Sequence, residues 1–128
     1  MSNKIVLVPS HFEKINSQLE GLHQEISVLS KKNPDGAVNK FKINHINSVL
    51  DEANKLLMGR YIPLKGFNNF DVDELPSNSD IVFVLMQYLM CMEQLRSDNI
   101  AMDFGEWFWK IDGKLTNVRT GQPKKLEK

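Results

Sequence analysis

The feature that most constrains this chain is the apolar run 81–92, which only Gln87 interrupts. A helix formed by this run is apolar on every side, so it must be enclosed on every side. Twelve helical residues span about 18 Å, well short of the roughly 30 Å of a bilayer core. We therefore expect a central helix over about residues 79–97, capped by Ser77 and Asp80, in a protein that does not cross a membrane.

Two amphipathic segments upstream can cover this helix. The first has apolar residues at alternating spacings of three and four, which is typical of one buried helix face: Phe12, Ile15, Leu19, Leu22, Ile26 and Leu29. It predicts a helix over about residues 11–31 that begins with a capping box formed by Ser10 and Glu13. The second segment predicts a helix that begins somewhere within 37–44 and ends at Gly59.

The C-terminal third contains two strand-like runs, 106–111 and 114–119, joined by Asp112 and Gly113. An Asp-Gly pair in this setting indicates a hairpin with a two-residue type I′ turn. The turn sets a predicted register of four cross-strand pairs: Ile111 with Lys114, Trp109 with Thr116, Trp107 with Val118, and Glu106 with Arg119. Residues 4–8 are expected to add a third strand, because a lone hairpin is marginally stable.

These elements predict an α+β, mainly helical fold, with a three-helix core, a packed aromatic loop and a small C-terminal antiparallel hairpin. The 128 residues suffice for one globular domain, expected over residues 1–120, and the polar, lysine-rich residues 121–128 are expected to be a disordered basic tail. Sixteen basic and sixteen acidic residues balance, which argues against a dedicated duplex-DNA binder. The single cysteine, Cys91, favours a reducing, cytoplasmic location.

The aromatic loop spans residues 60–77 and lacks periodicity, but it is too apolar for a solvated linker. A loop of this length inside a compact domain is uncommon and often functional. We expect it to fold over the helices as a packed flap. An acidic cluster begins in this loop and consists of Asp71, Asp73, Glu74 and Asp80. The spacing of these residues does not match a calcium-binding loop.

Catalytic and cofactor signatures are weak. Glu20 and His23 match one half of a di-metal helix-bundle pattern, but the remaining ligands are absent, so they predict a solvated helix edge. Cys91 lies within the apolar run, where a thiol is usually an inert hydrophobe. No catalytic, cofactor-binding or metal-binding residue is therefore predicted.

Small size, neutral charge and abundant apolar surface favour a non-enzymatic protein-interaction module: an adaptor, an inhibitor or immunity-type protein, or a small subunit of a complex. The partner would be another protein or, in a homodimer, a second copy. The expected contact residues lie in the flap and on the hairpin: Tyr61, Phe67, Phe70, Asp71, Asp73, Glu74, Phe108 and Arg119.

Two other classes of function remain open. Aromatic residues on a sheet flanked by cations can stack single-stranded bases, which would use the Trp107–Trp109 hairpin together with Lys124 and Lys125 of the tail. A small enzyme with a pocket under the flap would use one of the three histidines, His11, His23 or His45, as acid or base.

Overall fold

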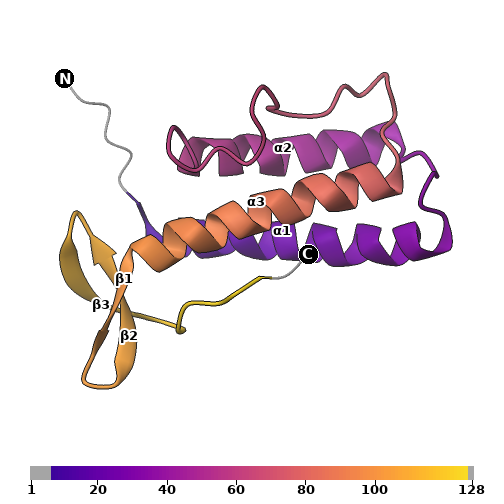
Figure 1. Cartoon of the computed structure of the whole chain (residues 1–128). Helices are drawn as coiled ribbons and strands as arrows, with labels where there is room; N and C mark the ends of the chain where they lie inside the picture. Colours follow the sequence, from indigo (N-terminus) through magenta and orange to yellow (C-terminus); the bar gives the residue numbers. More distant parts are fainter. Residues whose placement is uncertain (1–6, 127–128) are drawn as a thin grey trace.

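The computed structural model describes residues 7–126, which form three helices followed by a three-stranded sheet (Figure 1). The α+β, mainly helical fold expected from the sequence is thereby confirmed. The elements in chain order are α1 (Pro9–Lys32), α2 (Lys40–Leu56), α3 (Asn78–Asp98), β1 (Ile100–Asp103), β2 (Glu106–Ile111) and β3 (Lys114–Thr120).

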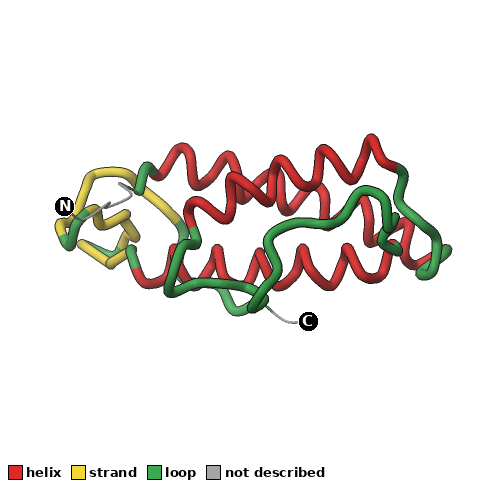
Figure 2. The backbone as a smooth tube through the Cα atoms, turned by 90° about the horizontal axis from the view of Figure 1, so that it is seen from above, coloured by secondary structure: helices red, strands yellow, loops and turns green. Residues whose placement is uncertain are grey.

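The three helices form a bundle, and the sheet lies at one end of it, directly after the C-terminus of α3 (Figures 1 and 2). The flap, residues 60–77, follows α2 along the bundle. The 21 residues of α3 correspond to about 30 Å of helix. The end of the flap and the sheet therefore lie at opposite ends of the molecule.

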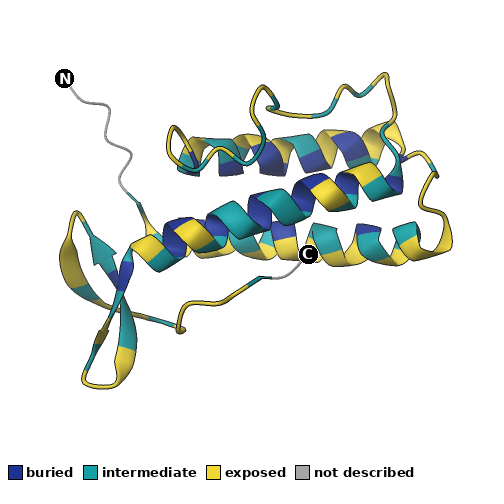
Figure 3. Ribbon diagram, viewed as in Figure 1, coloured by how far each residue is buried: buried dark blue, intermediate teal, exposed yellow. Residues whose placement is uncertain are grey.

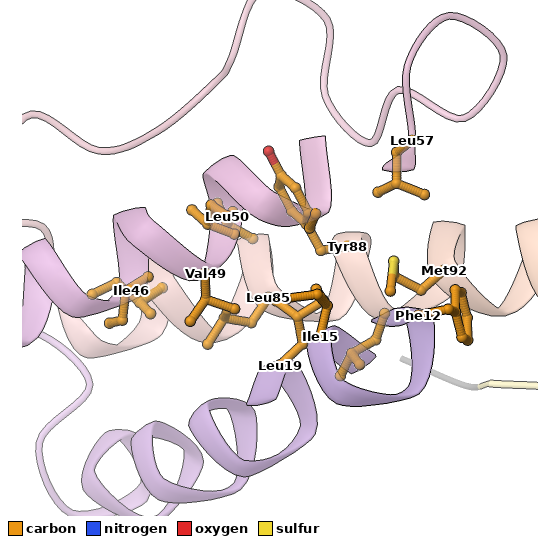
Figure 4. Close-up of a cluster of buried hydrophobic side chains, with 14 of the residues drawn as sticks. Phe12, Ile15, Leu19, Ile46, Val49, Leu50, Leu57, Leu85, Tyr88 and Met92 are labelled. Carbon is orange, nitrogen blue, oxygen red and sulfur yellow. The ribbon is translucent and has the colours of Figure 1, made fainter. Parts of the chain in front are cut away.

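The core between the helices is built from the predicted apolar faces (Figure 4). α1 buries Phe12, Ile15, Leu19 and Ile26, in agreement with its stripe. The sheet closes one end of this core through Trp109, whose fully buried ring meets Phe12 edge-on at 5.1 Å between centroids. Edge-on aromatic contacts of this kind add to the free energy gained from burial.

The helix termini correct two predictions. α1 begins at Pro9 after Val8, with no side-chain cap, so the capping box of Ser10 and Glu13 is wrong. Proline suits the first helical position because the amide hydrogen that it lacks would have no partner there. α2 begins within the predicted interval but ends at Leu56, ahead of Gly59.

The start of α3 agrees with the sequence prediction. Ser77 is its N-cap, and the hydroxyl accepts a hydrogen bond from the Asp80 amide at 3.2 Å. Such a bond satisfies one of the four free amides at a helix start.

The strand register departs from the prediction beyond the turn. Asp112 and Gly113 have positive φ values of 50° and 77°, as a type I′ turn requires. Ile111 pairs with Lys114 as expected, but a register shift places Trp107 opposite Thr120 instead of Val118.

Two further predicted pairs are affected by this shift. Trp109 and Thr116 do not form the predicted backbone pair, because they lie at the register shift. They are joined instead by the Thr116 hydroxyl, which donates to the Trp109 carbonyl at 2.7 Å. Phe108 takes the place of Glu106 opposite Arg119. A bulge of this kind inserts residues that the alternating pattern of a strand does not reveal.

The third strand is not the expected one. β1, which follows α3 directly, pairs antiparallel with β2. Of the predicted strand 4–8, residues 4–6 lie outside the described residues, and Leu7 and Val8 belong to no strand. The β1–β2 turn contains Phe104 and Gly105, both with positive φ. Phenylalanine is not typical of such a turn, so the sequence pattern concealed it.

The prediction that α3 is enclosed on every side is wrong. One stripe of the helix is accessible to solvent (Figure 3). Phe83 belongs to this stripe and is 51% exposed. The bundle covers the other faces only, because two helices and a loop cannot surround a third completely. Within residues 7–126, no helix is both long and apolar enough to cross a membrane.

Candidate functional site

The flap is fastened to α2 by two asparagine side chains. The Asn47 amide donates to the Phe70 carbonyl and accepts from the Phe70 amide, both at 2.8 Å. Asn54 donates to the Asn68 carbonyl at 2.8 Å. These bonds replace the backbone pairing that an irregular loop lacks. The flap is therefore packed against the helices, as the sequence indicated.

An aromatic cluster lies beneath the flap. Phe67 meets Phe70 edge-on at 5.1 Å and Tyr88 of α3 at 6.4 Å. The Tyr88 hydroxyl donates to the Asn54 side chain at 2.6 Å. Burial raises the pKa of Tyr88 to about 12, so this tyrosine stays protonated and keeps its donor role.

The start of α3, directly after the flap, is tied to the α1–α2 connection. The buried Asn78 side chain donates to the Asn33 carbonyl at 2.9 Å, and its backbone amide donates to the Gly36 carbonyl at 2.8 Å. A Cβ atom at Gly36 would lie 2.6 Å from the side-chain amide of the exposed Asn33, which would have to shift to make room for it. These contacts fix the position at which α3 begins.

A groove of about 450 Å³ lies between the end of the flap and the first turns of α3. We call it the flap groove. It is lined by Phe70, Asp71, Glu74, Leu75, Pro76, Ser77, Asp80, Phe83 and Val84. Its apolar part includes Phe83, 51% exposed, and Leu75, 38% exposed. Leu75 has a φ of 46°, a conformation that is uncommon for a branched residue.

The charged part of the flap groove is entirely acidic. Asp71, Glu74 and Asp80 contribute carboxylates, and no described basic residue lines the groove. Within residues 7–126 none of these three carboxylates forms an ion pair, whereas neighbouring Asp73 lies 3.4 Å from the Lys40 ammonium. The dipole of α3 stabilises the charge of Asp80, which lies in the first turn of the helix. Asp71 and Glu74 lie outside the helix.

Metal binding has no support here. Among the side chains that the structure describes, no three His, Cys, Asp or Glu residues gather into a group that could hold a metal ion.

The structure brings together only some of the predicted contact residues. Phe70, Asp71 and Glu74 line the flap groove, and Asp73 lies beside it. Phe67 points into the aromatic cluster beneath the flap.

The other predicted contact residues lie far from the groove. Tyr61 belongs to the opposite end of the flap, where its hydroxyl donates to Asp98 at 2.8 Å. Burial and this carboxylate raise the pKa of Tyr61. Phe108 and Arg119 are paired in the sheet at the far end of α3 (Figure 1). The predicted residues therefore belong to three separate surfaces.

Sequence reasoning missed Phe83 and Leu75. A signal for Phe83 was present, since the inward positions of α3, including Ile81, Leu85, Tyr88 and Met92, follow helical spacing. Phe83 is two residues, or about 200°, from Ile81, so it points away from the core. No comparable signal exists for Leu75, because its exposure depends on the path of the flap.

The histidines lie elsewhere. His11 and His45 are exposed, and His23 is half-buried in a separate cavity of about 250 Å³ between α1 and α3. Burial lowers the pKa of His23. Burial also raises the pKa of the Cys91 thiol, which disfavours the reactive thiolate. In the described structure, none of these groups lines the flap groove.

The aromatic residues of the hairpin do not form one stacking surface. Trp109 is fully buried, and the partly exposed Trp107 and Phe108 alternate across the sheet. A base-stacking platform needs several aromatic rings on one accessible face.

An arginine within α3 organises the C-terminal end. Arg96 is 6% exposed, and its guanidinium donates twice to the Glu93 carboxylate at 2.8 Å. It also donates to the Thr120 hydroxyl and to two backbone carbonyls just beyond it, at 2.7–2.8 Å. A paired, fully hydrogen-bonded arginine of this kind is costly to disrupt.

The segment that Arg96 holds, residues 121–126, is called here the C-terminal strap. The Lys124 amide donates to Glu93 at 2.8 Å, and Leu126 packs against the core. The sequence predicted a disordered tail over residues 121–128. The described part has no regular secondary structure, and its contacts with α3 were not indicated by any local pattern.

Comparisons with protein-family models, with curated proteins and with solved structures found no match.

Proposed function

We propose that this protein is a non-enzymatic protein-interaction module that binds a protein partner through the flap groove. The observation that carries the proposal is the half-exposed Phe83 beside three carboxylates in one groove, none of which forms an ion pair within residues 7–126. Protein interfaces commonly combine an aromatic centre with a polar rim. Exposed apolar surface rimmed by polar residues is typical of interaction sites.

The groove is also held in a defined shape. Asn47 binds the flap to α2, and Asn78, the first residue of α3 after the flap, binds the α1–α2 connection. A pre-organised surface loses less conformational entropy on binding than a mobile loop. This supports a binding role for the flap, as an adaptor, an inhibitor or a small subunit of a complex.

Site-specific photo-crosslinking tests the proposal. A photoreactive phenylalanine analogue replaces Phe83 in the chain, and a second version carries it at Phe104, which is 99% exposed at the far end of α3. Both are expressed in the native cells and irradiated. We expect a defined crosslinked protein at Phe83 that is absent or much weaker at Phe104.

The mass of the product identifies the partner class. A product of twice the chain's mass would make a second copy the partner. Crosslinking at Phe104 but not at Phe83 would contradict the proposal and move the interface to the sheet. Diffuse, equal products at both positions would also contradict it, since they would show no specific site.

A further inference from the structure

We infer that the partner presents to the flap groove an extended segment with an aliphatic anchor flanked by lysine or arginine. This inference rests on the proposed function and adds the chemistry of the partner. It follows from a comparison of the two halves of the accessible stripe of α3, one of which is already occupied by the chain itself.

The stripe runs along α3 at helical spacing through Phe83, Met86, Met90, Gln94 and Ser97. The C-terminal strap lines the last part of it: residues 124–126 share a hollow with Met90, Gln94 and Ser97. Phe83 belongs instead to the flap groove. One helix face therefore has a half that the strap borders, called here the covered half, and an open half, where no strap residue lines the groove.

The strap shows what kind of segment fits this face. It runs antiparallel to α3, with Gly121 at Arg96, Lys124 at Glu93 and Leu126 beside Met86 (Figure 1). It has no regular secondary structure. Its contacts combine a backbone hydrogen bond to a carboxylate with a leucine against apolar side chains of α3.

The open half offers the same chemistry, and no segment of the described residues fills it. Phe83 lies three residues before Met86, about 4.5 Å along the helix. Phe83 and Leu75 provide apolar surface, as Met86 and Leu89 do beneath Leu126. An aliphatic side chain in an extended segment therefore fits the flap groove as Leu126 fits its own site.

The charges add the second requirement. Glu93 in the covered half is neutralised by Arg96 at 2.8 Å. The carboxylates of the open half, Asp71, Glu74 and Asp80, have no cation among the described side chains. The partial charge at the α3 N-terminus, about half a unit, offsets only a small part of three full charges. Charge complementarity thus calls for lysine or arginine in the partner.

The test uses the full chain and a fluorescein-labelled probe peptide, Pro-Lys-Lys-Leu-Lys-Lys-Leu, measured by fluorescence polarisation. We expect saturable binding that weakens at least tenfold when Phe83 is changed to Ser. The triple variant Asp71→Asn, Glu74→Gln, Asp80→Asn should weaken it to a similar extent. Peptides with Glu for Lys, or Ser for Leu, should not bind measurably.

A matched control separates the groove from the overall charge. The triple variant Glu13→Gln, Asp35→Asn, Asp112→Asn removes the same charge from exposed positions outside the groove. It should bind the peptide as the unmodified chain does. Equal weakening by both triple variants would overturn the inference, because attraction would then be non-specific.

Backbone amide NMR shifts locate the bound peptide. Shifts centred on residues 70–84 support the inference, whereas shifts confined to 86–97 would mean that the peptide merely displaces the strap. Absence of peptide binding overturns this inference alone if Phe83 still crosslinks a protein. If the Phe83 crosslink is also absent, the proposed function fails with it.

Discussion

The two ends of α3 differ in the surroundings of their carboxylates. At the C-terminal end, Glu93 is nearly buried and is bound by the Arg96 guanidinium and the Lys124 amide. At the N-terminal end, Glu74 and Asp80 line an open groove without a basic partner among the residues that the structure describes. Within residues 7–126, the carboxylate at the C-terminal end is therefore paired by the chain itself, whereas those at the N-terminal end are not.

This difference indicates which charged groups of α3 stabilise the fold and which are available for binding. A buried ion pair is retained when its remaining hydrogen bonds are satisfied, as those of Arg96 are. Exposed carboxylates near an apolar surface contribute little to stability but set which ligands are attracted. The C-terminal end of α3 therefore stabilises the fold, whereas the groove carboxylates at the N-terminal end contribute little to stability and, in the proposed function, attract the partner.

The largest expected effect on stability comes from removing the Arg96–Glu93 ion pair at the C-terminal end of α3. Arg96→Met leaves Glu93 without its cation and should cost about 3–5 kcal/mol of unfolding free energy. The control Arg119→Met breaks an exposed pair with Glu106 at 3.1 Å and should cost at most about 1 kcal/mol. Urea denaturation measures both. Equal costs would show that Arg96 does not organise this end.

The same substitution at the two ends gives the next largest contrast. Glu93→Gln weakens charged hydrogen bonds and should cost about 1.5–3 kcal/mol. Glu74→Gln, on the exposed flap, should change stability by no more than about 0.5 kcal/mol. Thermal unfolding of the two variants side by side checks this. A large loss at Glu74 would mean that the groove carboxylates serve the fold.

Releasing the flap should have an intermediate effect on stability and a strong effect on the groove. Asn47→Ala removes two hydrogen bonds to Phe70 and should cost about 1–2 kcal/mol. Hydrogen exchange of residues 68–72 should accelerate, and probe-peptide binding should fall. Asn44→Ala, at an exposed position of the same helix, is the control and should leave both unchanged.

The smallest expected effect is a pH dependence of stability that arises from His23, in the cavity beside the C-terminal strap. His23 shares its cavity with Glu20, Glu93 and Lys124, and burial lowers the pKa of His23 below its usual 6.5. The unfolded chain then binds the proton more tightly, so stability is fully present above pH 6.5 and declines as the pH falls through the folded pKa. Unfolding measured from pH 7.5 to 5 should show this decline, reduced in His23→Gln. An unchanged decline in that variant would assign it to other groups.

Much of the fold was predictable from short-range patterns. The stripe beginning at Phe12 identified α1, Ser77 marked the start of α3, and Asp112 with Gly113 marked the last turn. These predictions succeeded because caps, turns and helix faces depend on residues within about four positions of one another.

The predictions that failed depend on contacts between residues more than about four positions apart, or on a local residue choice that is unusual for its structure. Trp107 pairs two residues away from its expected partner because a bulge changes the register. β1 was missed because Phe104 is an unusual turn residue, and Ser10 is not the N-cap of α1 because the helix begins one residue earlier, at Pro9. Of the site, Phe70, Asp71 and Glu74 were predicted as contact residues, but the distance of Tyr61 and Arg119 from them was not.

The sequence by itself determined the helices, the final hairpin turn, the packed character of the flap and the local density of acidic residues. Only the tertiary structure decided that Phe83 is exposed, that Arg96 is buried beside Glu93, and that the chain's own strap lines the last part of the accessible stripe of α3. The physical reason is distance along the chain. Arg96 reaches carbonyls 25 and 26 residues away, and Asn47 reaches Phe70 across 23. No local pattern encodes such pairings.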